Sequence, residues 1–170
     1  MSLKRKRRRA SFCLGGSLIL DVGSGGKPFR FKGGEVVHVD VLRAEDVEVV
    51  CDAHHLPFKD KCFSLVHASH VIEHLKHPLD AVKEFERVCR GTVIIKVPNA
   101  KCDFAYEHLY SWNKKTLETF LKQAFKEVKV YPSVRVTPYK KPFLKLLSRA
   151  KTFVVIGLFG PNELTAVCKT

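Results

Sequence analysis

The stretch that most constrains this chain is Leu18–Gly26, which reads LILDVGSGG. Its apolar start is typical of a short strand that is buried on both faces, as in a parallel sheet. Asp21, at the tip of this strand, can accept hydrogen bonds from a ligand's ammonium group or from the amides of the loop. The glycines that follow let the backbone turn sharply and let a ligand approach the main chain closely. The stretch therefore predicts a nucleotide-like cofactor over this loop, although strand-to-loop turns that bind nothing share the pattern.

Three more apolar stretches follow the same pattern, in which a short strand ends at polar residues. They are Val36–Val39 before Asp40, Val47–Cys51 before Asp52, and Phe63–Ala68 before Ser69 and His70. Because the carboxyl ends of parallel strands meet at one edge of a sheet, we expect Asp21, Asp40 and Asp52 along that edge. The sequence therefore predicts an α/β fold with a mostly parallel sheet.

The remaining pattern predicts two amphipathic helices and further strands. A short helix is expected up to Leu75, a longer one over Pro78–Cys89 with His77 near its N-cap, and another after Asn113. Strands are expected over Thr92–Val97 and Val128–Tyr131, and a last hairpin over Phe153–Leu158 and Leu164–Cys168. The connection Lys27–Glu35 contains a proline and two glycines, so we expect at most one helical turn there.

Charge is the most unusual property of the composition. The chain has 170 residues, enough for one domain, with 30 Lys and Arg against 17 Asp and Glu, so its net charge is +13. We expect a basic arm at residues 1–16, which includes the run Lys4–Arg9, and a single domain at 17–170 with a basic insert at about 132–151. Such an excess attracts nucleic acid or another polyanion, although solvated lysines that only aid solubility give the same pattern.

Hydropathy and cysteine spacing indicate the compartment. No apolar run approaches the roughly 18 residues of a membrane span, and no secretory signal is recognisable. We therefore expect a soluble cytoplasmic protein, or a nuclear one if Lys4–Arg9 acts as an import signal. The six cysteines are scattered without a C-x-x-C pair, which predicts reduced and mostly buried thiols.

Four segments, taken in order, resemble those of the class I S-adenosylmethionine-dependent methyltransferases. They read LILDVGSGG, VVHVD, VVCDAHHLPFKDKCFSLVHASHVIEHL and KVPN, and the resemblance runs from about Leu18 to Tyr131. The greatest likeness is to a compact group with a D-A-x-x-L-P-F segment before the fourth strand. The resemblance implies a Rossmann-like fold with helices on both faces of the sheet and S-adenosylmethionine as the cofactor. The first crossover helix is here expected to be shortened.

The resemblance also implies roles for individual residues. Asp21, Gly23, Ser24 and Gly25 would lie beside the methionine part of the cofactor, and Asp40, followed by Val41, would bind the ribose hydroxyls. Asp52, Ala53 and His54 would face the adenine, and Ser69 and His70 would flank the sulfonium. A single acid at such a position is often only a cap or a loop hydrogen bond, but three in register favour a ligand. Pro28 replaces the third glycine of a dinucleotide motif, which counts against a nicotinamide dehydrogenase.

One further motif, His70-Val71-Ile72-Glu73-His74, matches the H-x-x-E-H pattern of inverted zinc proteases. On a helix both histidines would lie on one face with Glu73 beside them. The motif directly follows a predicted parallel strand, however, and the methyltransferase resemblance accounts for it. We therefore expect no metal.

The predicted activity is methyl transfer from S-adenosylmethionine to RNA or to an anionic small molecule. Displacement at a carbon activated by positive sulfur needs mainly correct positioning, so the lack of a catalytic triad is no objection. His70 is the best-placed base, but packing against the cofactor is its favoured role. Tyr106, His108, Tyr110 and Trp112 are candidates for stacking on the acceptor or for simple packing. The alternative is a non-catalytic Rossmann-like module that binds nucleic acid.

Overall fold

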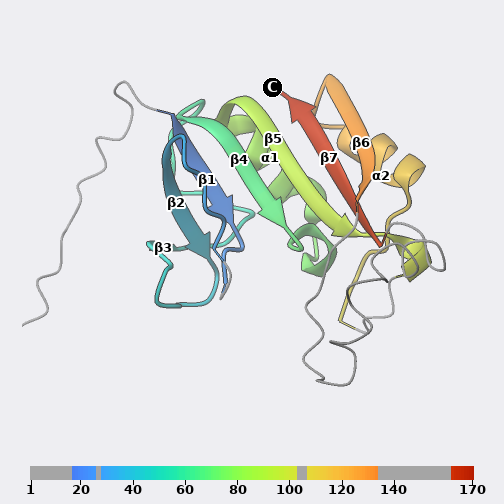
Figure 1. The fold of residues 1–170 in the computed structure, drawn as a ribbon, viewed down its shortest axis with the longest axis horizontal. Coiled ribbons are helices and arrows are strands. Elements are labelled where there is room, and N and C mark those ends of the chain that lie inside the picture. Colours follow the sequence, from blue (N-terminus) through green and yellow to red (C-terminus); the bar gives the residue numbers. More distant parts are fainter. Residues whose placement is uncertain (1–16, 26–27, 103–106, 134–161) are drawn as a thin grey trace, which may run out of the picture.

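The computed structural model describes residues 17–25, 28–102, 107–133 and 162–170, which form one seven-stranded sheet (Figure 1). Its strands are β1 (Leu18–Val22), β2 (Glu35–Asp40), β3 (Val49–Val50), β4 (Phe63–Ser69), β5 (Cys89–Pro98), β6 (Glu127–Ser133) and β7 (Glu163–Lys169). They lie in the order β3-β2-β1-β4-β5-β7-β6, and only β7 is antiparallel to its neighbours. The predicted mostly parallel, Rossmann-like α/β fold is confirmed.

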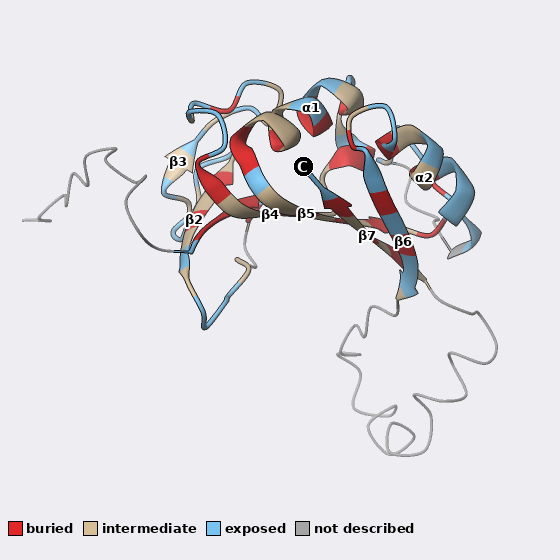
Figure 2. Ribbon diagram, turned by 90° about the horizontal axis from the view of Figure 1, so that it is seen from above, coloured by how far each residue is buried: buried red, intermediate tan, exposed pale blue. Residues whose placement is uncertain are grey.

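One face of this sheet carries the apolar core. The α-helices α1 (Pro78–Val88) and α2 (Lys114–Leu121) both lie on this face (Figure 2). Four α1 side chains are fully buried against it: Ala81, Val82, Phe85 and Val88. Alternate residues of the strands complete the core, as expected for strands whose side chains point to opposite faces in turn. Helices were expected on both faces, and in the described ranges both α-helices cover this one.

The opposite face is organised around a buried carboxylate. Asp21 is 3% exposed and alternates with the core-facing residues of β1. It accepts hydrogen bonds from Phe29 N at 2.8 Å and contacts His38 Nδ1 at 3.0 Å and His67 Nδ1 at 2.8 Å. The Phe29 ring stacks on the His67 ring with 4.2 Å between centroids. Residues 28–34 contain no helix, so this short segment covers part of the face where a crossover helix would otherwise pack.

Local capping follows the sequence closely. The Asn113 side chain accepts from Thr116 N at 3.0 Å, and the Thr116 hydroxyl accepts from Asn113 N at 2.9 Å, which forms a capping box at the start of α2. At α1, His77 is the N-cap residue and Pro78 takes the first helical position, where its missing N–H costs nothing. Both predicted helix starts are confirmed.

The last strand is placed differently from the prediction. Leu164–Cys168 does form a strand, β7, but it is not one arm of a hairpin with Phe153–Leu158. β7 pairs along its whole length with β5 on one side and with β6 on the other, so neither of its edges is free. Residues 153–158 lie outside the described residues, as do the arm at 1–16 and nearly all of the insert predicted at 132–151.

Smaller differences have local causes. β3 contains only two residues, and the short helix before α1 is a 3₁₀ turn, η1 (Ile72–His74); a second, η2, spans Ala100–Cys102. The strand expected from Thr92 begins earlier, at Cys89, and contains Gly91, where an added Cβ would overlap the Ser64 carbonyl oxygen of β4. Pro132 lies within β6, which is tolerated because β6 is an edge strand of the described sheet.

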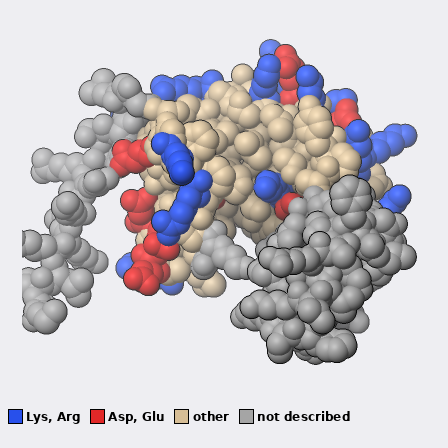
Figure 3. All heavy atoms as spheres, viewed as in Figure 1, with Lys and Arg blue, Asp and Glu red and all other residues tan. Residues whose placement is uncertain are grey.

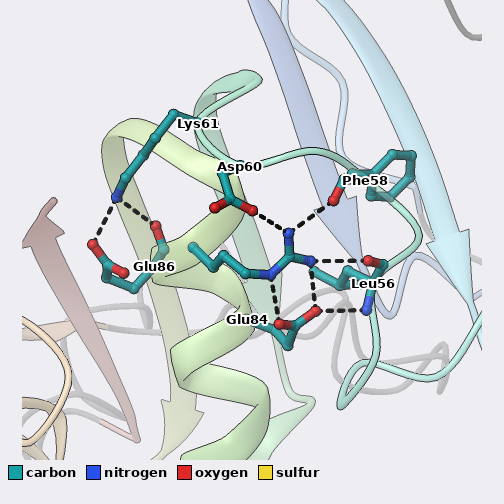
Figure 4. Close-up of polar contacts among 7 residues, drawn as sticks. Leu56, Phe58, Asp60, Lys61, Glu84 and Glu86 are labelled. Carbon is teal, nitrogen blue, oxygen red and sulfur yellow. Dashed lines mark hydrogen bonds and ion pairs between the residues drawn. The ribbon is translucent and has the colours of Figure 1, made fainter.

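The connection from β3 to β4 is fixed by one arginine of α1 (Figure 4). Arg87 donates to the carbonyls of Leu56 at 3.0 Å and Phe58 at 2.9 Å, and to the carboxylates of Glu84 at 2.6 and 2.8 Å and Asp60 at 2.7 Å. These contacts raise the pKa of Arg87 further above its ordinary value, with the Glu84 hydrogen bond as the main cause. The planar guanidinium suits such a multidentate role. Arg87 therefore holds in place the loop that begins with Asp52.

The cysteines whose side chains the structure describes are mostly buried, as expected. Cys62, Cys89 and Cys168 are buried and Cys51 is half-buried, and Cys51, Cys89 and Cys168 are free thiols. Burial raises the pKa of the Cys168 thiol to about 12, so this thiol is unreactive at neutral pH. Across the described part of the chain, no helix has the length and apolar character that a membrane span needs.

Candidate cofactor site

The glycine loop and the end of β2 are joined by main-chain and carboxylate hydrogen bonds. Gly23 N and Ser24 N donate to Val39 O at 2.9 and 3.2 Å. Gly25 N donates to Asp40 Oδ2 at 2.9 Å, and Leu42 N donates to Asp40 Oδ1 at 2.9 Å. A carboxylate offers about four acceptor positions, so each oxygen of Asp40 retains capacity for a ligand hydroxyl. The loop thus orients Asp40 before any ligand arrives, and the residue fits the two hydroxyls of a ribose.

Two glycines of the loop have backbone conformations that residues with a side chain rarely adopt. Gly23 and Gly25 have positive φ angles of 68° and 45°, which side chains rarely adopt. A Cβ at Gly23 would also overlap Cγ2 of Val71, in the segment between β4 and η1. The loop Gly23–Gly25, called the cofactor loop below, therefore lies directly against the residues that follow β4.

The predicted adenine side lies at the next strand. Cys51 N donates to Asp40 O at 3.0 Å, which places Asp52 beside the end of β2. Asp52 Oδ1 accepts from His54 N at 2.9 Å and contacts His54 Nδ1 at 2.6 Å, and these hydrogen bonds lower the pKa of Asp52. Ala53 is half-buried in the same turn, and the side chain of Val41 is 66% exposed. The polar side chains of Asp52 and His54 thus lie close in sequence to the apolar Ala53. A site of mixed polar and apolar groups would suit an adenine ring.

His70, at the tip of β4, lies between two carboxylates. Its backbone is left-handed with φ of 56°, and its N donates to Lys96 O at 2.9 Å. Its Nδ1 lies 3.1 Å from Glu73 Oε1, and its Nε2 lies 3.1 Å from Glu163 Oε1. Burial alone would raise the pKa of Glu163, but the His70 hydrogen bond and the Lys96 charge outweigh burial and lower it. Because both ring nitrogens are engaged, the geometry favours a positioning role for His70.

Comparison with known protein families points to a function. A family model described as a methyltransferase domain matches residues 20–97, which span the glycine loop, Asp40, Asp52 and the end of β4. This match covers less than half of the 170-residue chain, so it shows that this region is similar to a methyltransferase domain. Comparison with curated protein sequences gave no significant match.

Solved structures show the same fold. The chain is similar to an S-adenosylmethionine-dependent methyltransferase from Archaeoglobus fulgidus, with a TM-score of 0.61 and 18% identity over 94% of this chain and 88% of that chain. It is also similar to phosphoethanolamine N-methyltransferase 2 from Haemonchus contortus in complex with S-adenosyl-L-methionine, with a TM-score of 0.60, 17% identity and coverage of 91% and 49%. A Haloferax volcanii complex of the Trm112 methyltransferase activator and a putative methyltransferase gives a TM-score of 0.63, 16% identity and coverage of 91% and 82%.

The structure brings most of the predicted cofactor residues to one edge of the sheet. Gly25 N donates to Asp40, and Gly23 N and Ser24 N donate to the neighbouring Val39 O. Asp52 is one hydrogen-bonded strand away. Asp21 differs, because its carboxylate is buried beneath residues 28–31 and already contacts two histidines and Phe29 N. In this chain Asp21 thus supports the loop from the opposite face of the sheet.

Sequence reasoning missed several residues around this edge. Glu163 reaches His70 across 93 positions of sequence through the pairing of β7, and no local pattern indicated it. Glu73 was named from the sequence only as part of the H-x-x-E-H motif, and its contact with His70 was not predicted. Trp112, a candidate for acceptor stacking, is 7% exposed and packs on Phe120 with 4.5 Å between ring centroids, so it belongs to the core.

Proposed function

We propose that the chain is an S-adenosylmethionine-dependent methyltransferase that methylates an RNA, with the cofactor bound over Gly23–Gly25. Asp40 would bind the ribose hydroxyls, Asp52 and His54 the adenine side, and Ser69 and His70 the side of the reactive methyl group. The preset hydrogen bond from Gly25 N to Asp40 at 2.9 Å supports this cofactor placement. The reaction is an in-line displacement at the methyl carbon, so the protein's main task is to align the acceptor with the methyl group.

The distribution of charge along the chain is the observation that favours RNA as the acceptor. The described residues contain 17 basic and 16 acidic residues, a net charge of +1, whereas the whole chain has +13. Six of the remaining positive charges lie in residues 1–16 and six in residues 134–161, without any acidic residue in either segment. Figure 3 shows acidic side chains gathered on the side of β2 and β3. Positive charge concentrated in two segments of the sequence, with a nearly neutral remainder, suits a long polyanion better than a small acceptor.

The cofactor placement is tested by calorimetric titration with S-adenosylmethionine and with its demethylated product. In Asp40→Ala we expect affinity for both to fall on the order of 100-fold, because two charge-assisted hydrogen bonds are lost. Asp46→Ala removes the same charge from an exposed position after β2 and serves as the matched control. Equal affinities in the two variants would disprove the assignment of Asp40.

The acceptor is tested by transfer of a labelled methyl group to total RNA. Replacement of the six basic residues in Lys4–Arg9 by serine should reduce transfer and weaken its salt dependence, because fewer phosphate contacts form. Unchanged transfer to a small anionic acceptor, with no transfer to RNA, would reject RNA as substrate. RNA binding without cofactor binding or any transfer would instead support the non-catalytic module.

A further inference from the structure

Three side chains of types that commonly bind metal ions converge after the end of β4. Glu73 and His74 belong to η1 and His108 comes from residues 107–110, and their potential ligand atoms all lie within 4.8 Å of one another. None of the three belongs to the predicted cofactor set. The H-x-x-E-H motif suggested His70 and His74 as a pair, but the structure directs His70 to Glu163 and brings His108 to His74 instead.

The backbone fixes this cluster. Leu109 N and Tyr110 N both donate to Glu73 O, at 2.8 and 3.3 Å, so the segment with His108 is attached to η1 by main-chain hydrogen bonds. The imidazole rings of His74 and His108 lie 4.7 Å apart between centroids, at an angle of 72°. The proximity of these side chains is therefore imposed by backbone contacts.

Glu73 supplies an independent sign of a ligand. Its side chain is completely buried, with 0% exposure. Oε1 contacts His70 Nδ1 at 3.1 Å, whereas Oε2 is buried without a hydrogen-bond partner among the described residues. A buried carboxylate oxygen without a partner is strongly unfavourable, and a bound cation would satisfy it.

We propose that Glu73, His74 and His108 bind one divalent transition-metal ion. One carboxylate and two imidazoles form a donor set that zinc, cobalt and manganese accept, whereas magnesium and calcium prefer oxygen ligands alone. Metal–nitrogen bonds of about 2.0–2.1 Å place tetrahedral ligand atoms about 3.4 Å apart. His74 is exposed and His108 is half-buried. Metal binding would bring the ligand atoms, now within 4.8 Å of one another, to about 3.4 Å. Three protein ligands leave a coordination position open.

The position of the metal site suggests a role in activating the methyl acceptor. Val71, which touches Gly23 of the cofactor loop, is followed directly by η1, so the metal lies near the methyl end of the predicted cofactor pocket. An acceptor hydroxyl at the open position would be acidified by the metal and release its proton to water. Its oxygen would then bond to the methyl carbon while the carbon–sulfur electron pair returns to sulfur. This role rests on the proposed function, whereas metal binding itself does not.

Metal binding is tested on the tag-free, metal-stripped full-length chain by absorption spectroscopy during Co²⁺ titration. We expect one equivalent to bind, Zn²⁺ to displace it, and excess Mg²⁺ to have no effect. His74→Ala and His108→Ala should each weaken Co²⁺ binding at least tenfold, and His55→Ala, at an exposed position outside the cluster, should match the unchanged protein. Absence of Co²⁺ binding, or equal binding in His108→Ala and His55→Ala, would overturn the proposal.

Two further variants separate this result from the proposed function. Glu73→Gln keeps the shape of the buried side chain and should also lose Co²⁺ binding; if it does not fold, the two histidine variants still decide. Asp40→Ala should bind Co²⁺ normally while it loses S-adenosylmethionine. Failure of the metal site and failure of the cofactor site are thus visible in different titrations.

Discussion

The two faces of the sheet hold the molecule together in different ways. The face under α1 and α2 is an apolar core that includes the fully buried Phe85. On the other face, one buried carboxylate, Asp21, contacts His38, His67 and a backbone N–H of residues 28–31. The first face depends on the area removed from water, and the second on directed polar contacts. The cofactor loop lies at the end of β1, between the two, so its position depends on both.

The largest effect is expected on the apolar face. Phe85→Ala leaves a cavity beneath α1 and should lower the free energy of unfolding by about 3–5 kcal/mol. Urea denaturation followed by circular dichroism measures this loss. Phe31→Ala, at a side chain that is 47% exposed, is the matched control and should cost much less. Equal losses would contradict the assignment of the core to the helix-covered face.

A smaller loss is expected on the polar face. Asp21→Asn removes the charge that three donors share and should lower the free energy of unfolding by about 1–3 kcal/mol. Asp46→Asn, at an exposed position, should be neutral. In a double-mutant cycle with His67→Asn, the losses should be non-additive, because the two side chains are in contact at 2.8 Å. Additive losses would show that the polar contact contributes nothing of its own.

The smallest expected effect is on the pH dependence of stability, and it comes from the contact between Arg87 and Glu84 on the helix-covered face. The Arg87 hydrogen bond holds the pKa of Glu84 below its ordinary value of 4.5. A lowered carboxyl pKa stabilises the fold above the unfolded-state pKa, and this stabilisation is lost as pH falls through the folded-state value. Melting temperature should therefore drop below about pH 4.5, and less steeply in Glu84→Gln. Identical profiles would show that Arg87 stabilises the loop through its carbonyl contacts alone.

Elements with a local pattern could be predicted from the sequence. Strands β1, β2 and β4 follow from short apolar runs before polar residues, and the start of α2 follows from Asn113 and its spacing to the apolar positions. The approach of Gly25 to Asp40 followed from the rule that parallel strands end at one edge. These parts depend on residues close in sequence or on general topology.

Contacts that depend on distant pairing could not be predicted in this way. β7 lies between β5 and β6, and this arrangement alone brings Glu163 to His70. Likewise, His38 and His67 have no recognisable periodicity, and only the pairing of β2 and β4 with β1 places both on Asp21. His108 approaches Glu73 through backbone hydrogen bonds for which residues 107–110 carry no sequence signature.

The interior position of β7 has a consequence for how the chain matures. During synthesis, β5 and β6 emerge before the strand that joins them, and Thr92 finds its partner Lys169 only 77 positions later. Until then β6 has no neighbour among the described strands, and the edge of β5 is open to pairing with other chains. Such non-local closure slows folding and prolongs the exposure of aggregation-prone edges. The sheet thus becomes continuous only when its last strand is inserted, and a cell that makes this protein must protect an unfinished sheet for that interval.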